Sequence, residues 1–160
     1  MKKVILAYGL LFLVILVIVI LKFNLINVFE KRFIPSYAQI GNRRFSLLLA
    51  RTEKERMTGL SNTNKLQENQ AMLFVFEKKE YYSFWMKNVK FPIDILFIND
   101  STIVDMYENV QPALSTMDTA GLPIYRSKKQ ANYVLEINGG LAKKTNVKVG
   151  NKITIKLTGT

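Results

Sequence analysis

Residues Ala71–Ile98 read AMLFVFEKKEYYSFWMKNVKFPIDILFI, in which three apolar segments are separated by short polar ones. Their lengths and their content of Phe, Ile, Val and Tyr predict strands at Ala71–Phe76, Tyr82–Lys87 and Asp94–Asn99. The first segment shows no alternation of polar and apolar residues, which is typical of a strand buried on both faces. This stretch therefore predicts a β-rich fold.

The residues before this stretch predict a hairpin followed by a short helix. Tyr37–Ile40 and Arg44–Ala50 flank a Gly-Asn turn, which is a common hairpin connection. Thr52 and Glu55 have the spacing of a capping box, in which each residue satisfies a backbone N–H of the other. The pattern predicts a helix at Glu53–Thr58.

The residues after the stretch continue the strand pattern. The predicted elements are a strand at Thr102–Val110, a long loop at Gln111–Pro123, a strand at Asn132–Ile137, a helical turn at Leu141–Thr145 and a strand at Lys152–Leu157. Many short strands separated by turn residues are typical of an antiparallel β-sandwich or barrel. We therefore predict one mainly β, antiparallel sandwich-like or barrel-like domain over residues 37–160, with one or two short helices.

An uncharged apolar run, Val4–Leu21, precedes this domain. A helix of this length spans roughly 27 Å, close to the thickness of the hydrocarbon core of a bilayer. The run is longer than the core of a cleaved signal peptide, and no small-residue cleavage site follows it. We therefore predict a short basic N-terminus at residues 1–3, a transmembrane signal anchor at 4–23 and a juxtamembrane linker at 24–36. The basic residues before the run favour export of the domain to the extracytoplasmic side.

The chain contains no Cys and no His. It therefore lacks the residues for a Cys nucleophile, a Ser-His-Asp triad, a zinc site of thiolates or imidazoles, a His-ligated haem and a disulfide. We expect no cofactor and no metal. Carboxylates, amines, hydroxyls and the single Trp remain for the chemistry of a site.

Five ordered motifs resemble one known family. They are Arg56 with Gly59 and Leu60, Met72–Phe76, Phe84–Asn88, Pro92–Ile95, and Tyr133–Glu136 followed by Gly140 and Gly150. Over roughly Ile40–Leu157 the chain is similar to the family named domain of unknown function 192. It departs from the family pattern at Ala71, Val89 and Gln130, where Gly, Thr and Pro are usual. The resemblance implies a mainly β domain, often behind a signal sequence or anchor, and it implies no activity.

The segment that contains the only Trp is the first candidate site. Alternation along a strand places Trp85 and Lys87 on one face, opposite Phe84 and Met86. An indole for stacking, an amine for an anionic group and the amide of Asn88 are suited to binding a ligand. The alternative is that Trp85 anchors the packing of the strand.

Carboxylates within apolar segments are the second kind of candidate. Asp94 lies between two Ile residues and needs a partner, because a buried unpaired carboxylate is costly. We expect Arg56, Arg51 or Lys87 to pair with it, either as a structural ion pair or in a polar pocket. Asp105 and Glu136 are similarly flanked and are candidates for acid–base chemistry or for binding a hard cation.

The charge of the chain adds a candidate surface. The formal net charge is +11, and residues 34–160 alone contain 18 basic and 11 acidic residues. Basic residues gather after position 125, where they can attract anionic lipid headgroups or an anionic envelope polymer. A solvated basic face is the alternative. No nucleic-acid reader motif is present, and we expect no nucleic-acid partner.

We therefore expect a membrane-anchored, extracytoplasmic β-domain that binds an anionic or carbohydrate-like ligand through Arg56, Trp85, Lys87, Asn88 and Asp94. One alternative is a His-free hydrolase that uses Asp94, Asp105 or Glu136, which requires two carboxyl groups in one pocket. Another is a structural accessory of an envelope complex, for which a large exposed apolar patch is expected. The lipid bilayer, contacted through residues 4–23, is the only partner that the sequence identifies, and any protein partner is unknown.

Overall fold

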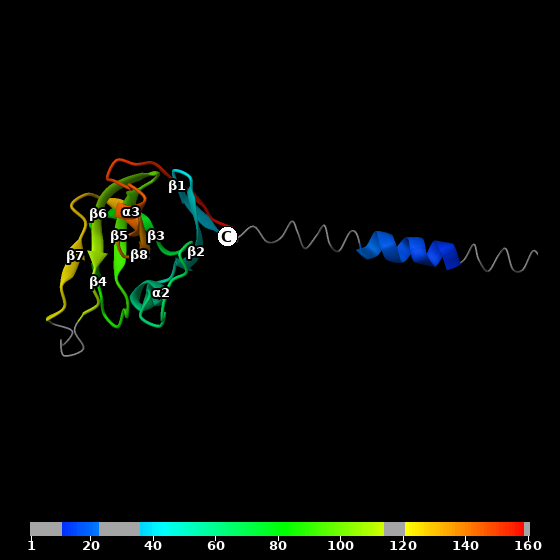
Figure 1. Ribbon diagram of the computed structural model, residues 1–160, viewed down its shortest axis with the longest axis horizontal. Coiled ribbons are helices and arrows are strands. Elements are labelled where there is room, and N and C mark those ends of the chain that lie inside the picture. The colour runs from blue at the N-terminus through cyan, green and yellow to red at the C-terminus, as the bar shows by residue number, and fades with distance from the viewer. Residues whose placement is uncertain (1–10, 23–35, 114–120, 159–160) are drawn as a thin grey trace, which may run out of the picture. The chain divides into compact units, whose positions relative to one another are not determined.

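A computed structural model of the chain describes residues 11–22, 36–113 and 121–158 (Figure 1). The chain divides into two units, Met1–Ile34 and Pro35–Thr160. All the strands that the structure describes lie in the second unit.

The first unit contains a helix over residues 11–22. The basic N-terminus predicted at 1–3, most of the linker predicted at 24–36, and both ends of the transmembrane segment predicted at 4–23 lie outside the described residues. Within the residues that are described, no helix has the length and apolar character needed to cross a membrane. The transmembrane segment at 4–23 therefore stays a prediction.

The second unit is mainly β. Seven strands form one sheet in the order β6-β5-β8-β3-β2-β1-β9. Their bounds are β1 Tyr37–Ile40, β2 Arg43–Ala50, β3 Gln70–Glu80, β5 Ile93–Asn99, β6 Thr102–Val110, β8 Ala131–Asn138 and β9 Ile153–Lys156. The remaining strands, β4 (Ser83–Trp85) and β7 (Ile124–Arg126), form a separate two-stranded ribbon. The helices of this unit are short: α2 spans Glu53–Thr58 and α3 spans Leu141–Lys144.

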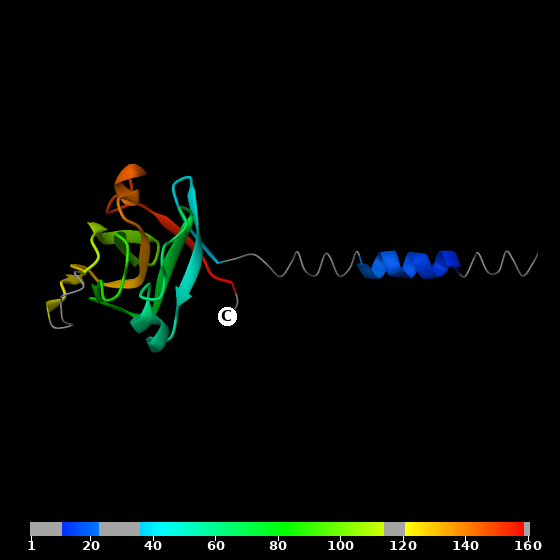
Figure 2. The same ribbon diagram turned by 60° about the horizontal axis from the view of Figure 1, so that its bottom comes forward.

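The sheet curls into a half-barrel (Figure 2). Its two end strands approach each other where Thr102, the first residue of β6, forms an antiparallel bridge with Lys152, just before β9. The Ile103 N–H donates to the Asn151 carbonyl at 3.0 Å, and the Ile153 N–H donates to the Ser101 carbonyl at 2.9 Å. These bonds join the two edges of the sheet at one corner.

One pairing differs from the predicted antiparallel arrangement. Strands β2 and β3 run parallel, with Leu48 opposite Met72, whereas the other paired strands of the sheet are antiparallel. Parallel neighbours need a long crossover connection. Here α2 and residues 59–69 carry the chain back to the start of the next strand.

Two hydrophobic clusters cover the two faces of the central strands. On β3, Leu73 packs into one cluster and Phe74 into the other. The same alternation places Leu135 of β8 on the face of Leu73, and Val134 on the face of Phe74. Residues 71–76 are therefore buried from both sides, as their unbroken apolar sequence predicts. The face of Phe74 is covered by α2 and the β4–β7 ribbon, and it holds the candidate site.

Candidate functional site

Helix α2 has the capping box that the sequence predicts. The Glu55 N–H donates to the Thr52 hydroxyl at 3.2 Å, and the Glu55 carboxylate accepts the Thr52 N–H at 2.8 Å. These backbone bonds, from Thr52 first and Arg51 second, lower the pKa of Glu55. The helix ends at Gly59, whose φ of +48° favours Gly. A Cβ at Gly59 would lie 3.3 Å from the Phe74 ring, so the missing side chain lets α2 pack closely on β3.

A cavity of about 270 Å³ lies between this helix and β4. We call it the α2–β4 pocket. Residues of α2, β3, β4 and β8 line it, together with Tyr82 and Lys87, which flank β4. The volume falls just below the range of about 300–1,000 Å³ that is common for small-molecule sites, so the pocket suits a small ligand or one unit of a longer chain.

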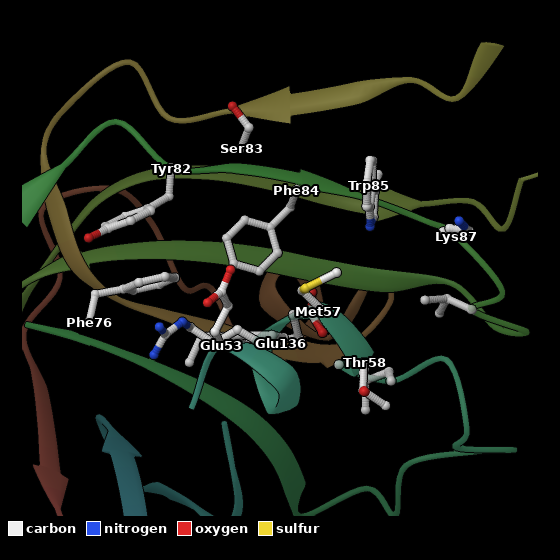
Figure 3. Close-up of a pocket in the computed structure, with 15 residues that line it drawn as sticks. Glu53, Met57, Thr58, Phe76, Tyr82, Ser83, Phe84, Trp85, Lys87 and Glu136 are labelled. Atoms are coloured by element: carbon white, nitrogen blue, oxygen red, sulfur yellow. The ribbon is translucent and has the colours of Figure 1, made fainter. Parts of the chain in front are cut away.

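Aromatic rings form much of the wall of the α2–β4 pocket. Phe76 and Tyr82 stack at one end with ring centroids 3.6 Å apart. Phe84 points from β4 into the pocket. Its ring meets the Phe74 ring edge-on, with the ring centroids 4.8 Å apart. Trp85 lies at the other end beside Lys87 (Figure 3), and its side chain is 46% exposed. An indole this open at the mouth of a pocket is available to a ligand, which favours the binding role over the packing role for Trp85.

Two cations line the pocket. The Arg56 guanidinium lies 5.2 Å from the centre of the Phe76 ring and donates to the carbonyls of Val75, at 3.1 Å, and Arg51. The Lys87 amine lies 5.8 Å from the centre of the Trp85 ring. Neither cation has a carboxylate partner among the described residues. Both can therefore donate hydrogen bonds to an anionic group of a ligand.

Glu136 is the acidic group at the inner wall of the pocket. Alternation on β8 turns it to the same face as Val134, opposite Met72 of β3. Its side chain is 4% exposed, and burial raises the pKa of its carboxyl group to about 8. Within the described part of the chain, the carboxyl group of Glu136 forms no hydrogen bond and no ion pair. Burial therefore favours the protonated form of this carboxyl group, which lines the pocket.

The structure brings three of the five predicted site residues together. Arg56, Trp85 and Lys87 all line the α2–β4 pocket. Asn88 lies in an open depression next to it, which shares Trp85 and Lys87 with the pocket. Asp94 does not line either one.

The expected pairing of Asp94 with Arg56, Arg51 or Lys87 is wrong. Asp94 is fully buried and accepts backbone N–H groups from Asn109 at 2.6 Å, Gly140 at 2.8 Å and Ala142 at 2.7 Å. The last two N–H groups belong to the start of α3. Because its neighbour Leu96 packs in the cluster on the other face from Phe74, alternation turns Asp94 away from the pocket. Asp94 therefore fastens α3 to the sheet.

Of the other carboxylates considered from the sequence, Asp105 also lies outside the pocket. It accepts N–H groups from Met106 at 3.0 Å and Lys128 at 2.8 Å. The pocket does contain a second acidic side chain, Glu53 of α2, which sequence reasoning missed. No cluster of three or more acidic side chains that could hold a metal ion occurs in the described part of the chain.

Sequence reasoning also missed the rings of Phe76 and Tyr82 as parts of the site. Their aromatic character was visible, but strand Ala71–Phe76 was predicted to end at Phe76, whereas β3 continues to Glu80. Tyr82 donates its hydroxyl to the Lys78 carbonyl at 2.8 Å, and burial raises the pKa of that hydroxyl. This local bond folds the chain between β3 and β4 over the end of the pocket.

Two solved structures are similar to this chain. One is a protein of Sinorhizobium meliloti 1021 that carries the provisional name of transcription regulator; it is 28% identical, with a TM-score of 0.67 over 75% of this chain and 92% of its own. The other is a protein of unknown function from Novosphingobium aromaticivorans DSM 12444; it is 29% identical, with a TM-score of 0.65 over 74% of this chain and 83% of its own.

A search of curated proteins finds no match to the chain. The profile of the family named domain of unknown function 192, described as uncharacterized ACR, matches residues 36–155. The match spans the half-barrel sheet, except for the last residue of β9, and both sides of the α2–β4 pocket. The chain therefore belongs to the domain of unknown function 192 family.

Proposed function

We propose that this protein is a membrane-anchored, extracytoplasmic binding module, and that the α2–β4 pocket binds a small saccharide-like ligand with an anionic group. The observation that carries the proposal is the pocket itself. It combines exposed Trp85, two cations without carboxylate partners, and a buried carboxyl group without a partner among the described residues.

The aromatic wall supports a ligand with flat, weakly polar faces. Trp85 and Phe84 present rings on which the C–H face of a sugar ring can stack, as apolar groups do on aromatic surfaces. The cations Arg56 and Lys87 can then bind a phosphate or carboxylate of the ligand through charge-assisted hydrogen bonds. Saccharides with such groups are components of many envelope polymers, which fits the proposed location.

The charge of the chain and its first residues support the location. Residues 34–160 hold 18 basic and 11 acidic residues, a surplus that draws anionic polymers or headgroups to the protein. The uncharged apolar run at residues 4–21 is long enough for an anchor.

The single Trp makes the proposal directly testable, because Trp85 is the only Trp in the chain and lies at the pocket. The full chain is titrated with glucose 6-phosphate and with glucose while the Trp fluorescence is recorded. We expect saturable changes, with tighter binding of the phosphate. Lys87→Ala should weaken phosphate binding by roughly 10-fold, whereas Lys90→Ala, which removes a lysine outside the pocket that bonds Asn64, should not. No saturable change with either sugar would overturn the proposal.

A second candidate function is a His-free hydrolase of glycosidic bonds. The observation that favours it is that Glu136, whose pKa is raised to about 8, shares the pocket with Glu53. A protonated carboxyl group in an apolar pocket can act as a general acid while a second carboxylate assists. Turnover of nitrophenyl glycosides that falls by about 100-fold or more in Glu136→Gln would support this function. Equal turnover by the variant would exclude it.

A further inference from the structure

The carboxyl group of Glu136 lacks a counter-charge from the described part of the chain. Burial raises the pKa of this group, and none of the described cations forms an ion pair with it. The other titratable groups that line the pocket are Glu53, Arg56, Tyr82 and Lys87, and none of them is bonded to Glu136.

The strand register explains why Arg56 does not reach Glu136. Glu136 lies opposite Met72 on β3, whereas Arg56 lies over Phe76, four residues further along the same strand. At a rise of about 3.3 Å per residue, the two strand positions are roughly 13 Å apart. Arg56 therefore lies toward the Phe76 end of the pocket, and Lys87 lies beside Trp85 at the other end.

We propose that the ligand of the α2–β4 pocket carries a free amino group, and that Glu136 binds this group as an ammonium ion while the rest of the sugar ring stacks on Phe84 and Trp85. The proposal rests on the binding function proposed above and names the class of its ligand: an amino sugar that is not acylated at the nitrogen. Binding turns Glu136 into its carboxylate form, and its proton leaves to solvent.

An ammonium group fits the chemistry around Glu136 better than a hydroxyl group does. An ammonium group brings both the missing charge and three N–H donors, and charge-assisted hydrogen bonds are roughly twice as strong as neutral ones. The faces of aromatic rings attract a cation, most of all where water is excluded. Figure 3 shows Phe84 pointing from β4 toward the side of the pocket where Glu136 lies.

Three sugars that differ at one position test the proposal. The full chain is titrated with glucose, glucosamine and N-acetylglucosamine, which carry a hydroxyl, an ammonium and an uncharged acetamide group at the same carbon, and Trp85 fluorescence reports binding. We expect glucosamine to bind at least about 10-fold more tightly than both other sugars. This comparison uses the unaltered protein, so it does not depend on the folding of a variant.

Two variants locate the interaction. Glu136→Gln should remove the advantage of glucosamine over glucose, because the amide is close in shape to the carboxyl group but carries no charge. Glu77→Gln is the control, since Glu77 is an exposed glutamate outside the pocket, and it should keep the advantage. A thermal melt confirms that each variant is folded.

The outcomes separate this inference from the proposed function. Saturable binding of all three sugars with equal affinity, or an advantage of glucosamine that survives in Glu136→Gln, would overturn the amino-group assignment and leave the binding function in place. No saturable change with any of the three sugars or with glucose 6-phosphate would overturn both.

Discussion

Two buried carboxyl groups of this protein are in opposite situations. Asp94 accepts three backbone N–H groups and is fully satisfied. Glu136 is almost as deeply buried and has no partner in the described part of the chain. A buried carboxylate that accepts several N–H groups stabilises the fold, whereas the Glu136 carboxyl group lines the α2–β4 pocket without such bonds. The difference indicates a structural role for Asp94 and supports the binding role that we propose for Glu136.

Asp94→Asn should destabilise the domain by about 2–4 kcal/mol, because the amide nitrogen cannot accept the N–H bonds that the lost oxygen received. The free energy of unfolding is measured by urea denaturation of the full chain. Asp105→Asn is the control, since Asp105 is less buried and accepts N–H groups from only Met106 and Lys128; it should cost less. A loss below about 0.5 kcal/mol for Asp94→Asn would contradict the structural role.

Glu136 should make the stability of the domain depend on pH. The pKa of its carboxyl group is 4.5 when exposed and about 8 in the folded protein. Between these two pH values, the folded state therefore keeps a proton that the unfolded state has released. The stability contributed by this group is complete below the lower value and is lost as the pH rises through the upper one, with an upper bound on the order of 5 kcal/mol.

Glu136→Gln cannot ionise and should lack this dependence. The test is urea denaturation of the parent and of Glu136→Gln from about pH 5 to about pH 9. The free energy of unfolding of the parent should fall relative to that of the variant from about pH 5 to about pH 8, and the difference should then level off. A constant difference would show that Glu136 has an ordinary pKa in the folded protein.

The sequence shows that Asp94, Asp105 and Glu136 lie among apolar residues, but not what their carboxyl groups meet. The partners of Asp94 are backbone groups from residues 109, 140 and 142, which come together only in the folded chain. Arg56 and Trp85 were predictable as site residues because of their chemistry and family motifs. Glu53 was not, because an acidic residue in the first turn of a helix is common for electrostatic reasons alone.

At the scale of the elements, local signals predicted local structure well. The capping box predicted α2 with its observed bounds, Glu53–Thr58, and the unbroken apolar run predicted the doubly buried part of β3. Strand β7, Ile124–Arg126, was missed because three residues carry no periodicity, and it is formed by pairing with β4. The parallel pairing of β2 with β3 depends on the path of the crossover, which no local pattern encodes.

The turn between β8 and α3 depends on Gly139. A Cβ at this position would lie 2.7 Å from the Pro92 Cβ and 2.9 Å from the Asn109 side-chain oxygen, so Gly139→Ala should cost about 1–3 kcal/mol of stability. Thermal or urea denaturation measures the loss. Gly41→Ala is the control, because no heavy atom lies within 4 Å of its added Cβ, although its positive φ adds a strain of about 1 kcal/mol. Equal losses in the two variants would contradict the close approach at Gly139.

At the scale of the whole molecule, the proposed anchor and location predict which protease can reach the domain. Proteinase added to intact spheroplasts should degrade the domain, because its Lys-rich and Arg-rich surface would face outward under the proposed orientation. A cytoplasmic protein serves as the control and should survive until the cells are lysed. A domain that is degraded only after lysis would contradict the extracytoplasmic location without affecting the pocket.

The α2–β4 pocket is formed by elements from several parts of the chain. Helix α2, the β4–β7 ribbon and strands β3 and β8 are distant in sequence, yet each contributes to the α2–β4 pocket. Because the curled sheet provides a rigid inner wall and α2 is fixed by its capping box, we expect the pocket to keep its shape when a ligand binds.

The most direct test of the account is a crystal structure of the full chain soaked with glucosamine. The account predicts density for one sugar in the α2–β4 pocket, with its nitrogen about 3 Å from the carboxylate of Glu136 and its ring against Phe84 and Trp85. An empty pocket at a saturating concentration of the sugar, or density bound only elsewhere on the protein, would contradict it.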